Sequence, residues 1–276
     1  MAYGKTIKIF LMDGDSSGKA SCELSNWMGR VFRIPRNLVN KSNIKEIALT
    51  GVYFLIGYDE ETNKKSIYIG EAENIEERLK QHFKEKDFWT ECLFVISDRN
   101  NLNKAHIKYL ENSFYNLAIK SNQYKVINKN EPSRSSISYA EEAEMLEFID
   151  NTKILINTLG YKAFEPLVSK QKLEKENEEI LYLNYKNIKA KALMTSEGFV
   201  LLKGSQIIEE MKDYTPNGYK ALRIKYKDKI KNLETVEDLL FNSPSAAAVF
   251  VTGKNQNGPR MWKNKAGKTL RELEEN

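Results

Sequence analysis

Three polar side chains in the first half of the chain have the types and spacing to act on an anion. Arg78 and His82 are four residues apart, so a helix through them would place both on one face. Glu111 lies between the apolar positions Ile107 and Phe114 of a later helical pattern. A carboxylate at such a core-facing edge is costly unless a cation accompanies it. We therefore expect Glu111 to meet a metal ion or an arginine such as Arg78.

Two tyrosines precede these residues and lie in apolar runs. Tyr53 is within residues 52–56 and Tyr68 is within residues 66–69, and both runs are rich in β-branched and aromatic residues. A polar insert separates the runs, which predicts two strands joined by a hairpin loop.

The elements that carry the other polar residues are predicted from their periodicity. Apolar side chains recur at helical spacing after Gly70, and they predict a helix whose adjacent face bears Arg78 and His82. The buried stripe of this helix is expected to be Ile75, Leu79 and Phe83. The remaining predicted elements are a strand at 91–97, a helix at 104–120 that bears Glu111, and an extended run at 124–127 that ends at Asn128.

The order of these residues resembles the GIY-YIG endonuclease superfamily. The resemblance covers about residues 51–130, and several elements agree in order and spacing. They are Gly51-Val52-Tyr53, Tyr68-Ile69-Gly70, Asn74, Arg78 and His82.

This resemblance implies a fold and an activity. The fold is α/β (α+β), with a small, mainly antiparallel three-stranded sheet flanked by helices. The activity is that of a metal-dependent endonuclease that hydrolyses phosphodiester bonds in DNA, which we expect to be duplex DNA. Restriction or defence and DNA repair are both open as its biological role.

The resemblance also implies a role for each polar residue. Glu111 would hold one Mg²⁺ or Mn²⁺ ion, which hard oxygen ligands suit, and Arg78 would offer a planar donor fork to a phosphate oxygen. Tyr53 would orient or deprotonate the attacking water, and His82 would relay that proton. The expected catalytic residues are Tyr53, Tyr68, Arg78, His82, Glu111 and Asn128, with Glu111 as the metal ligand.

Two residues depart from the family pattern. The family often has lysine directly after YIG, and this chain has Glu71; it often has Ser or Thr at the next position, and this chain has Ala72. A glutamate near the phosphate would repel it unless the glutamate serves the metal. A catalytically silent DNA-binding module is therefore one alternative. An RNA-processing nuclease is a second alternative, because the residues do not distinguish RNA from DNA.

Length and composition are those of a globular protein with more than one part. The chain has 276 residues, of which 41% are hydrophobic and 29% charged. No apolar run approaches the roughly 20 residues of a membrane span, and the N-terminus has no signal-peptide pattern. We expect a cytoplasmic protein in which Cys22 and Cys92 are buried free thiols. The sequence indicates no oligomeric state.

Composition and turn signals predict three parts. These are a β-rich N-terminal extension at 1–48, a nuclease domain at 49–165 and a small α+β domain at 180–276, with residues 169–179 as a polar linker or exposed helix. The block from 243 to 270 resembles a domain of uncharacterised function that often accompanies GIY-YIG proteins. In the extension, residues 22–36 interleave aromatics with arginines, which fits a nucleic-acid surface or the core and rim of a subdomain.

Charge is unevenly distributed along the chain. Residues 51–150 contain 13 Lys and Arg against 18 Asp and Glu, a net charge of −5, whereas residues 1–50 carry +4 and residues 151–276 carry +6. A nuclease needs phosphate contacts. We infer that the flanking regions supply much of the DNA affinity, although a modest basic surplus alone also fits a solvated surface.

Overall fold

A computed structural model describes residues 3–42, 44–60, 64–99, 101–168 and 180–275. The chain divides into two compact units, Met1–Pro166 and Leu167–Asn276. The expected linker at 169–179 lies outside the described residues. Within the described part, no helix has the length and apolar character needed to cross a membrane.

The first unit is built on one seven-stranded sheet. Its strand order is β1-β2-β3-β6-β4-β5-β7. All neighbours are antiparallel except β5 and β7, which are parallel. The strands are β1 (Ile7–Leu11), β2 (Ala20–Leu24), β3 (Gly29–Pro35), β4 (Gly51–Tyr58), β5 (Lys65–Ala72), β6 (Trp89–Ser97) and β7 (Lys125–Val126).

The mixed α/β class and the antiparallel arrangement are confirmed. The three strands expected from the sequence are β4, β5 and β6, with β4 between the other two. The N-terminal strands continue this sheet, because β3 pairs with β6 along its whole length, from Gly29–Ser97 to Pro35–Glu91.

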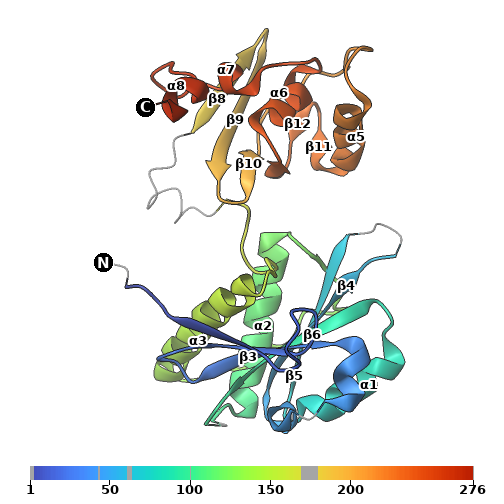
Figure 1. Cartoon of the computed structure of the whole chain (residues 1–276), viewed down its shortest axis with the longest axis vertical. Helices are drawn as coiled ribbons and strands as arrows, with labels where there is room; N and C mark the ends of the chain where they lie inside the picture. The colour runs from blue at the N-terminus through green and yellow to red at the C-terminus, as the bar shows by residue number, and fades with distance from the viewer. Residues whose placement is uncertain (1–2, 43, 61–63, 100, 169–179, 276) are drawn as a thin grey trace. The chain divides into compact units, whose positions relative to one another are not determined.

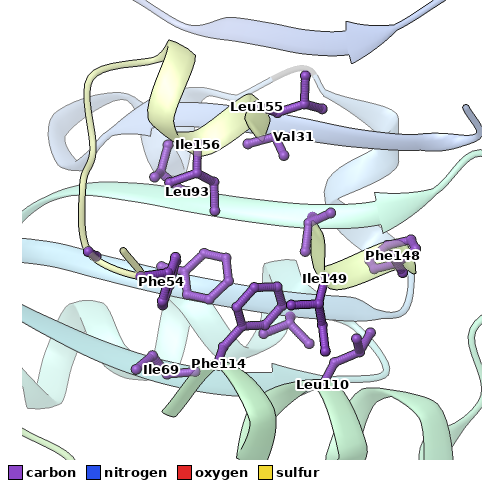
Figure 2. Close-up of a cluster of buried hydrophobic side chains, with 14 of the residues drawn as sticks. Val31, Phe54, Ile69, Leu93, Leu110, Phe114, Phe148, Ile149, Leu155 and Ile156 are labelled. Carbon is purple, nitrogen blue, oxygen red and sulfur yellow. The ribbon is translucent and has the colours of Figure 1, made fainter. Parts of the chain in front are cut away.

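Helices cover both faces of the sheet (Figure 1). Alternate residues of β4 point to opposite sides, and each side has its own apolar core. One core lies under α2 (Lys104–Ser121) and α3 (Tyr139–Thr158), and Figure 2 shows Phe54, Phe114 and Ile149 meeting there. The other core lies under α1 (Ile75–Glu85) and the short 3₁₀ helices η1 (Arg36–Lys41) and η2 (Lys45–Ala48).

Side-chain caps fix where the helices begin. The Asn74 side chain accepts a hydrogen bond from the Glu77 backbone N–H at 3.2 Å and caps α1. Asn103 and His106 form a reciprocal capping box at the start of α2, and Ser138 and Glu141 form another at the start of α3.

The arginines of residues 22–36 stabilise the fold of the first unit. Arg36 donates to the carbonyls of Lys86 at 2.6 Å and Phe83 at 3.1 Å, so it binds the end of α1. Arg30 pairs with Asp98 at 2.9 Å, and Arg33 donates to the Gly18 carbonyl at 2.6 Å. The structure therefore supports the interpretation of this segment as core and rim.

The second unit is a small α+β fold, as expected. Its main sheet has the order β13-β10-β9-β8. Ser243 caps α6 and Gly253 ends it with a left-handed φ of 70°, and Trp262 is fully buried in the core beside the sheet. The elements are β8 (Leu181–Tyr185), β9 (Ile188–Thr195), β10 (Gly198–Leu201), α5 (Asn217–Lys225), η3 (Lys227–Lys229), β11 (Ile230–Lys231), β12 (Glu234–Thr235), β13 (Leu239–Phe241), α6 (Pro244–Thr252), α7 (Gly258–Met261) and α8 (Leu270–Glu274).

Candidate active site

The centre of the candidate site is Tyr53, which is fully buried on β4. Gly70 of β5 lies directly opposite it across the strand pair. A Cβ at position 70 would overlap the Tyr53 hydroxyl and ring, so glycine leaves the space that the ring occupies. Packing against α1 on the other side then holds the tyrosine in one place.

The Tyr53 hydroxyl meets two side chains of α1. It lies 2.7 Å from Nε2 of His82, and Nε of Arg78 donates to it at 3.3 Å. Arg78 and His82 reach the same atom because they are one helical turn apart, as their spacing predicts. Arg78 can only donate, so the hydroxyl proton is available for His82.

Burial keeps both partners of this hydrogen bond neutral. Desolvation, with Arg78 and Lys86 nearby, lowers the pKa of His82 to about 4. Desolvation and the neighbouring Tyr68 raise the pKa of Tyr53 far above its ordinary range, although Arg78 opposes this. A neutral imidazole that accepts at Nε2 carries its proton on Nδ1, and this buried nitrogen has no hydrogen-bond partner among the described residues. The histidine is thus arranged to receive a proton through Tyr53.

Tyr68 adds an aromatic wall beside this pair. Its ring stacks on Tyr53 with centroids 6.3 Å apart and meets the His82 ring edge-on at 5.1 Å. The Lys86 ammonium lies 4.4 Å from the centroid of the Tyr68 ring. Lys86 therefore brings a positive charge to the site, which sequence reasoning missed because its position in the chain has no distinguishing pattern.

Arg78 forms the exposed surface of the site. Its Nη1 donates to Gln81 at 2.9 Å, and the hydrogen bond to Tyr53 raises its pKa further. The guanidinium has five N–H donors, so donors remain for a ligand. It contacts the hydroxyl of Tyr53, a residue with no solvent exposure.

Glu111 approaches from the opposite face of the sheet, on α2. It is half-buried, and burial together with the negative charge of Glu71 raises its pKa to about 7. The pKa of Glu111 is lowered, to a smaller extent, by the charges of Arg78 and Lys104 and by a hydrogen bond from the Glu71 backbone N–H. Among the described residues, no side chain forms a hydrogen bond or ion pair with this carboxylate. Glu111 also influences Tyr53 electrostatically, so the two halves of the site act on each other across the sheet edge.

Glu71, which departs from the family pattern, has its own cation. Nζ of Lys104 lies 2.9 Å from the Glu71 carboxylate and 3.6 Å from that of Glu73. Lys104 belongs to the first turn of α2, so a positive charge reaches the end of β5 from another element. The sequence could not indicate this pairing, because the two residues are 33 positions apart.

Asn128 does not join the other five residues. Its amide donates to the Ile69 carbonyl at 2.7 Å and accepts from the Ile69 N–H at 3.0 Å. The side chain thus continues the pairing of β5 with β7, which covers only Ser66 and Ile67 of β5. In the structure, Asn128 therefore supports the backbone of the Tyr68-Ile69-Gly70 segment.

The donor set suits a divalent cation at Glu111. A half-buried carboxylate that lacks a side-chain partner and lies beside a second carboxylate is stabilised when a cation binds. The described residues bring no group of three or more His, Cys, Asp or Glu side chains together. Such an ion would therefore keep water and substrate oxygens as its other ligands, as Mg²⁺ commonly does.

Comparison with protein families agrees with this geometry. Residues 50–135 match the family model described as the GIY-YIG catalytic domain. Residues 50–135 form a GIY-YIG domain. Residues 181–274 match a second family model, described as a domain of unknown function, DUF4357. Comparison with curated proteins gave no match, and comparison with solved structures gave none.

The GIY-YIG match accounts for both glycines of the motif in this structure. Gly70 leaves room for Tyr53, as described above. Gly51 lies against β6, where a Cβ would overlap the Val95 carbonyl oxygen. Gly70 therefore leaves space for the Tyr53 side chain, and Gly51 lets β4 lie close to β6. This family is a nuclease superfamily, so the match indicates a nuclease-type hydrolase domain at residues 50–135.

The neutral state of His82 predicts a pH-dependent stability of the GIY-YIG domain. The pKa of His82 is about 4 in the folded protein, against an ordinary value of 6.5. As pH falls from 6.5 to 4, the unfolded chain binds a proton that the folded chain does not, so the free energy of unfolding falls. We expect wild type to lose on the order of 2–3 kcal/mol more than His82→Gln in this window. Hydrogen exchange of the β4 amides, corrected for intrinsic rates, measures the difference.

His106→Gln is the matched control for this experiment. It removes His106 of α2, the only other histidine of the chain. Nε2 of His106 lies 3.2 Å from the Glu141 carboxylate. This variant should keep the wild-type dependence on pH. Parallel pH curves for wild type and His82→Gln would contradict the neutral, buried histidine.

Proposed function

We propose that this protein is a metal-dependent endonuclease that hydrolyses phosphodiester bonds in duplex DNA. The observation that carries the proposal is the Tyr53 hydroxyl, held 2.7 Å from a neutral His82 and under the Arg78 guanidinium, with the Glu111 carboxylate acting across the sheet edge. This arrangement provides a proton acceptor, an anion binder and a cation ligand in one place.

Arg78 would bind the scissile phosphate. Its guanidinium is at the surface and has donors beyond those given to Tyr53 and Gln81. On substrate binding, we expect it to exchange part of these contacts for a phosphate oxygen and to uncover the Tyr53 hydroxyl. A fixed guanidinium stabilises the extra negative charge that develops as water attacks.

His82 and Tyr53 would move the proton. Tyrosinate is disfavoured because burial raises the pKa of Tyr53, so the tyrosine is not expected to hold a lasting negative charge. Instead, the hydroxyl would accept a proton from the attacking water while giving its own proton to Nε2 of His82. Tyr53 can give its proton to His82 because Nε2 of the neutral imidazole has an unshared electron pair.

Glu111 would hold the divalent cation, and Glu71 lies close enough to influence it. When bound, an Mg²⁺ or Mn²⁺ ion supplies Lewis-acid polarisation of the phosphate and stabilisation of the leaving 3′ oxygen. Lys104 offsets the charge of Glu71, which reduces its repulsion of the phosphate. This pairing supports the proposal that a nucleic-acid substrate binds beside Glu71.

A catalytically silent DNA-binding module is the main alternative. It would bind DNA and lack the proton path, whereas here Tyr53, Arg78 and His82 are all present and hydrogen-bonded. A competition assay decides whether the substrate is DNA or RNA. In this assay, unlabelled RNA of the same sequence competes with labelled duplex DNA.

We expect Glu111→Gln to abolish cleavage and to leave DNA binding nearly unchanged. The substitution is close to isosteric and removes the charge that would hold the cation. Nicking of supercoiled plasmid in Mg²⁺ measures cleavage, and fluorescence anisotropy with a labelled duplex measures binding.

Glu77→Gln is the control for this substitution, because Glu77 is an exposed carboxylate on α1. It should cut like wild type. If Glu111→Gln cleaves at the wild-type rate in Mg²⁺, the carboxylate is not a metal ligand. Loss of secondary structure by circular dichroism would instead assign Glu111 a structural role.

We expect Arg78→Ala to slow cleavage by about 10²–10³ at saturating enzyme, because one donor to a developing anion typically has this effect. Arg78→Lys should recover only part of the rate, since an ammonium lacks the planar fork. Lys80→Ala removes an exposed cation two residues away on the same helix and should be nearly silent. A single-turnover rate for Arg78→Ala within a few-fold of wild type would refute this assignment.

A further inference from the structure

The second unit contains a cluster of positive charge around one tyrosine. Tyr185 is the last residue of β8, and its half-buried ring packs against the core of the unit. The Lys254 ammonium lies 4.9 Å from the ring centroid and the Lys186 ammonium lies 5.7 Å from it. Both distances are within the range of cation–π interactions.

A third lysine reaches the same place from a separate loop. The Lys212 N–H donates to the Gly253 carbonyl at 2.8 Å, which places Lys212 beside the residue that precedes Lys254. Three segments distant in sequence, at 186, 212 and 254, thus converge on Tyr185. The pKa of Tyr185 is lowered, first by its hydrogen bond with Lys254 and then by the charges of Lys254, Lys186 and Lys212.

A second observation is the ion pairing of these three lysines within the described part of the chain. None of the three lysines forms an ion pair there, whereas Lys229 of the same unit pairs with Glu237 at 2.7 Å and Arg271 pairs with Glu275 at 2.8 Å. Lys186 also has a left-handed φ of 52°, a conformation that glycine or asparagine adopts more easily. The turn therefore holds a lysine beside Tyr185 although another residue would be less strained.

We propose that Tyr185, Lys186, Lys212 and Lys254 form a phosphate-binding surface for the backbone of the nucleic-acid substrate. Ammonium groups bind phosphate as point charges, and a phenol hydroxyl donates to the same oxygens. Such contacts do not read the base sequence, and they fix the position of the protein on the strand. The inference rests on the proposed function and gives the DUF4357 unit a part in it, namely retention of the substrate of the GIY-YIG domain.

The test compares two triple variants of the full chain, each in the Glu111→Gln background so that binding is measured without cutting. One is Lys186→Gln, Lys212→Gln and Lys254→Gln. The control is Lys227→Gln, Lys231→Gln and Lys265→Gln, which removes the same charge from three exposed lysines that are not among the groups acting on Tyr185. Affinity for a 30-base-pair duplex is measured by anisotropy over a range of NaCl concentrations, with circular dichroism to verify folding.

We expect the first variant to lower the log–log salt slope by about 2.7, at about 0.9 for each lost phosphate contact, and the control to lower it by less than about 1. Tyr185→Phe, which keeps the ring and removes only the hydroxyl, should weaken binding a few-fold. The proposed phosphate-binding surface would be contradicted if the two triple variants had equal salt slopes, or if neither variant changed the slope.

Failure of this proposal is separable from failure of the nuclease. The lysine variants are also assayed with Glu111 intact, in low salt and excess enzyme. If the wild-type protein cuts DNA and the lysine substitutions leave the salt slope unchanged, the nuclease is retained and the phosphate-binding surface is rejected. Absence of cutting by wild type, together with the expected fall in slope, would retain the surface and reject the nuclease.

Discussion

The hydroxyl of Tyr53 is the constraint on which the first unit depends. A phenol without solvent exposure must be hydrogen-bonded inside the protein, since an unsatisfied buried hydroxyl costs about 1–3 kcal/mol. Here α1 supplies the partners, and the helix must lie where both Arg78 and His82 reach one oxygen atom. The hydrogen bonds that stabilise the fold are therefore the same ones that arrange the groups we propose to be catalytic.

This constraint explains why neighbouring positions need particular residues. Gly70 must be small because the tyrosine ring lies against it, and Asn74 sets the first turn of α1 and with it the phase of the helix. Asn128 satisfies the backbone of Ile69 where β7 no longer pairs with β5. Each residue supports the position of Tyr53, Tyr68 or Arg78.

Much of this arrangement is predictable from the sequence, because it depends on local periodicity. The strands that carry Tyr53 and Tyr68 and the helix that carries Arg78 and His82 follow from apolar spacing. The half-buried position of Glu111 at the core-facing edge of its helix follows in the same way, whereas the cation at Glu111 stays a prediction. The capped helix that starts after Ser243 is likewise present.

Other features depend on contacts between distant segments, which periodicity does not report. The β3–β6 pairing joins the N-terminal strands to the strands of the GIY-YIG domain, and the Lys104–Glu71 pair links α2 to β5. The convergence of Lys186, Lys212 and Lys254 on Tyr185 likewise requires the folded second unit. In the sequence, the members of each feature lie far apart and share no motif.

The most direct test of the proton path and the cation site is to map the products that the full chain forms on a defined duplex. The reaction is run with Mg²⁺ or Mn²⁺, and with EDTA in parallel, and the ends are identified by ligation and by labelling. Attack by water with departure of the 3′ oxygen predicts 5′-phosphate and 3′-hydroxyl ends, formed with either metal and absent with EDTA. Cleavage that persists in EDTA, or no cleavage by folded protein with either metal, would contradict the account.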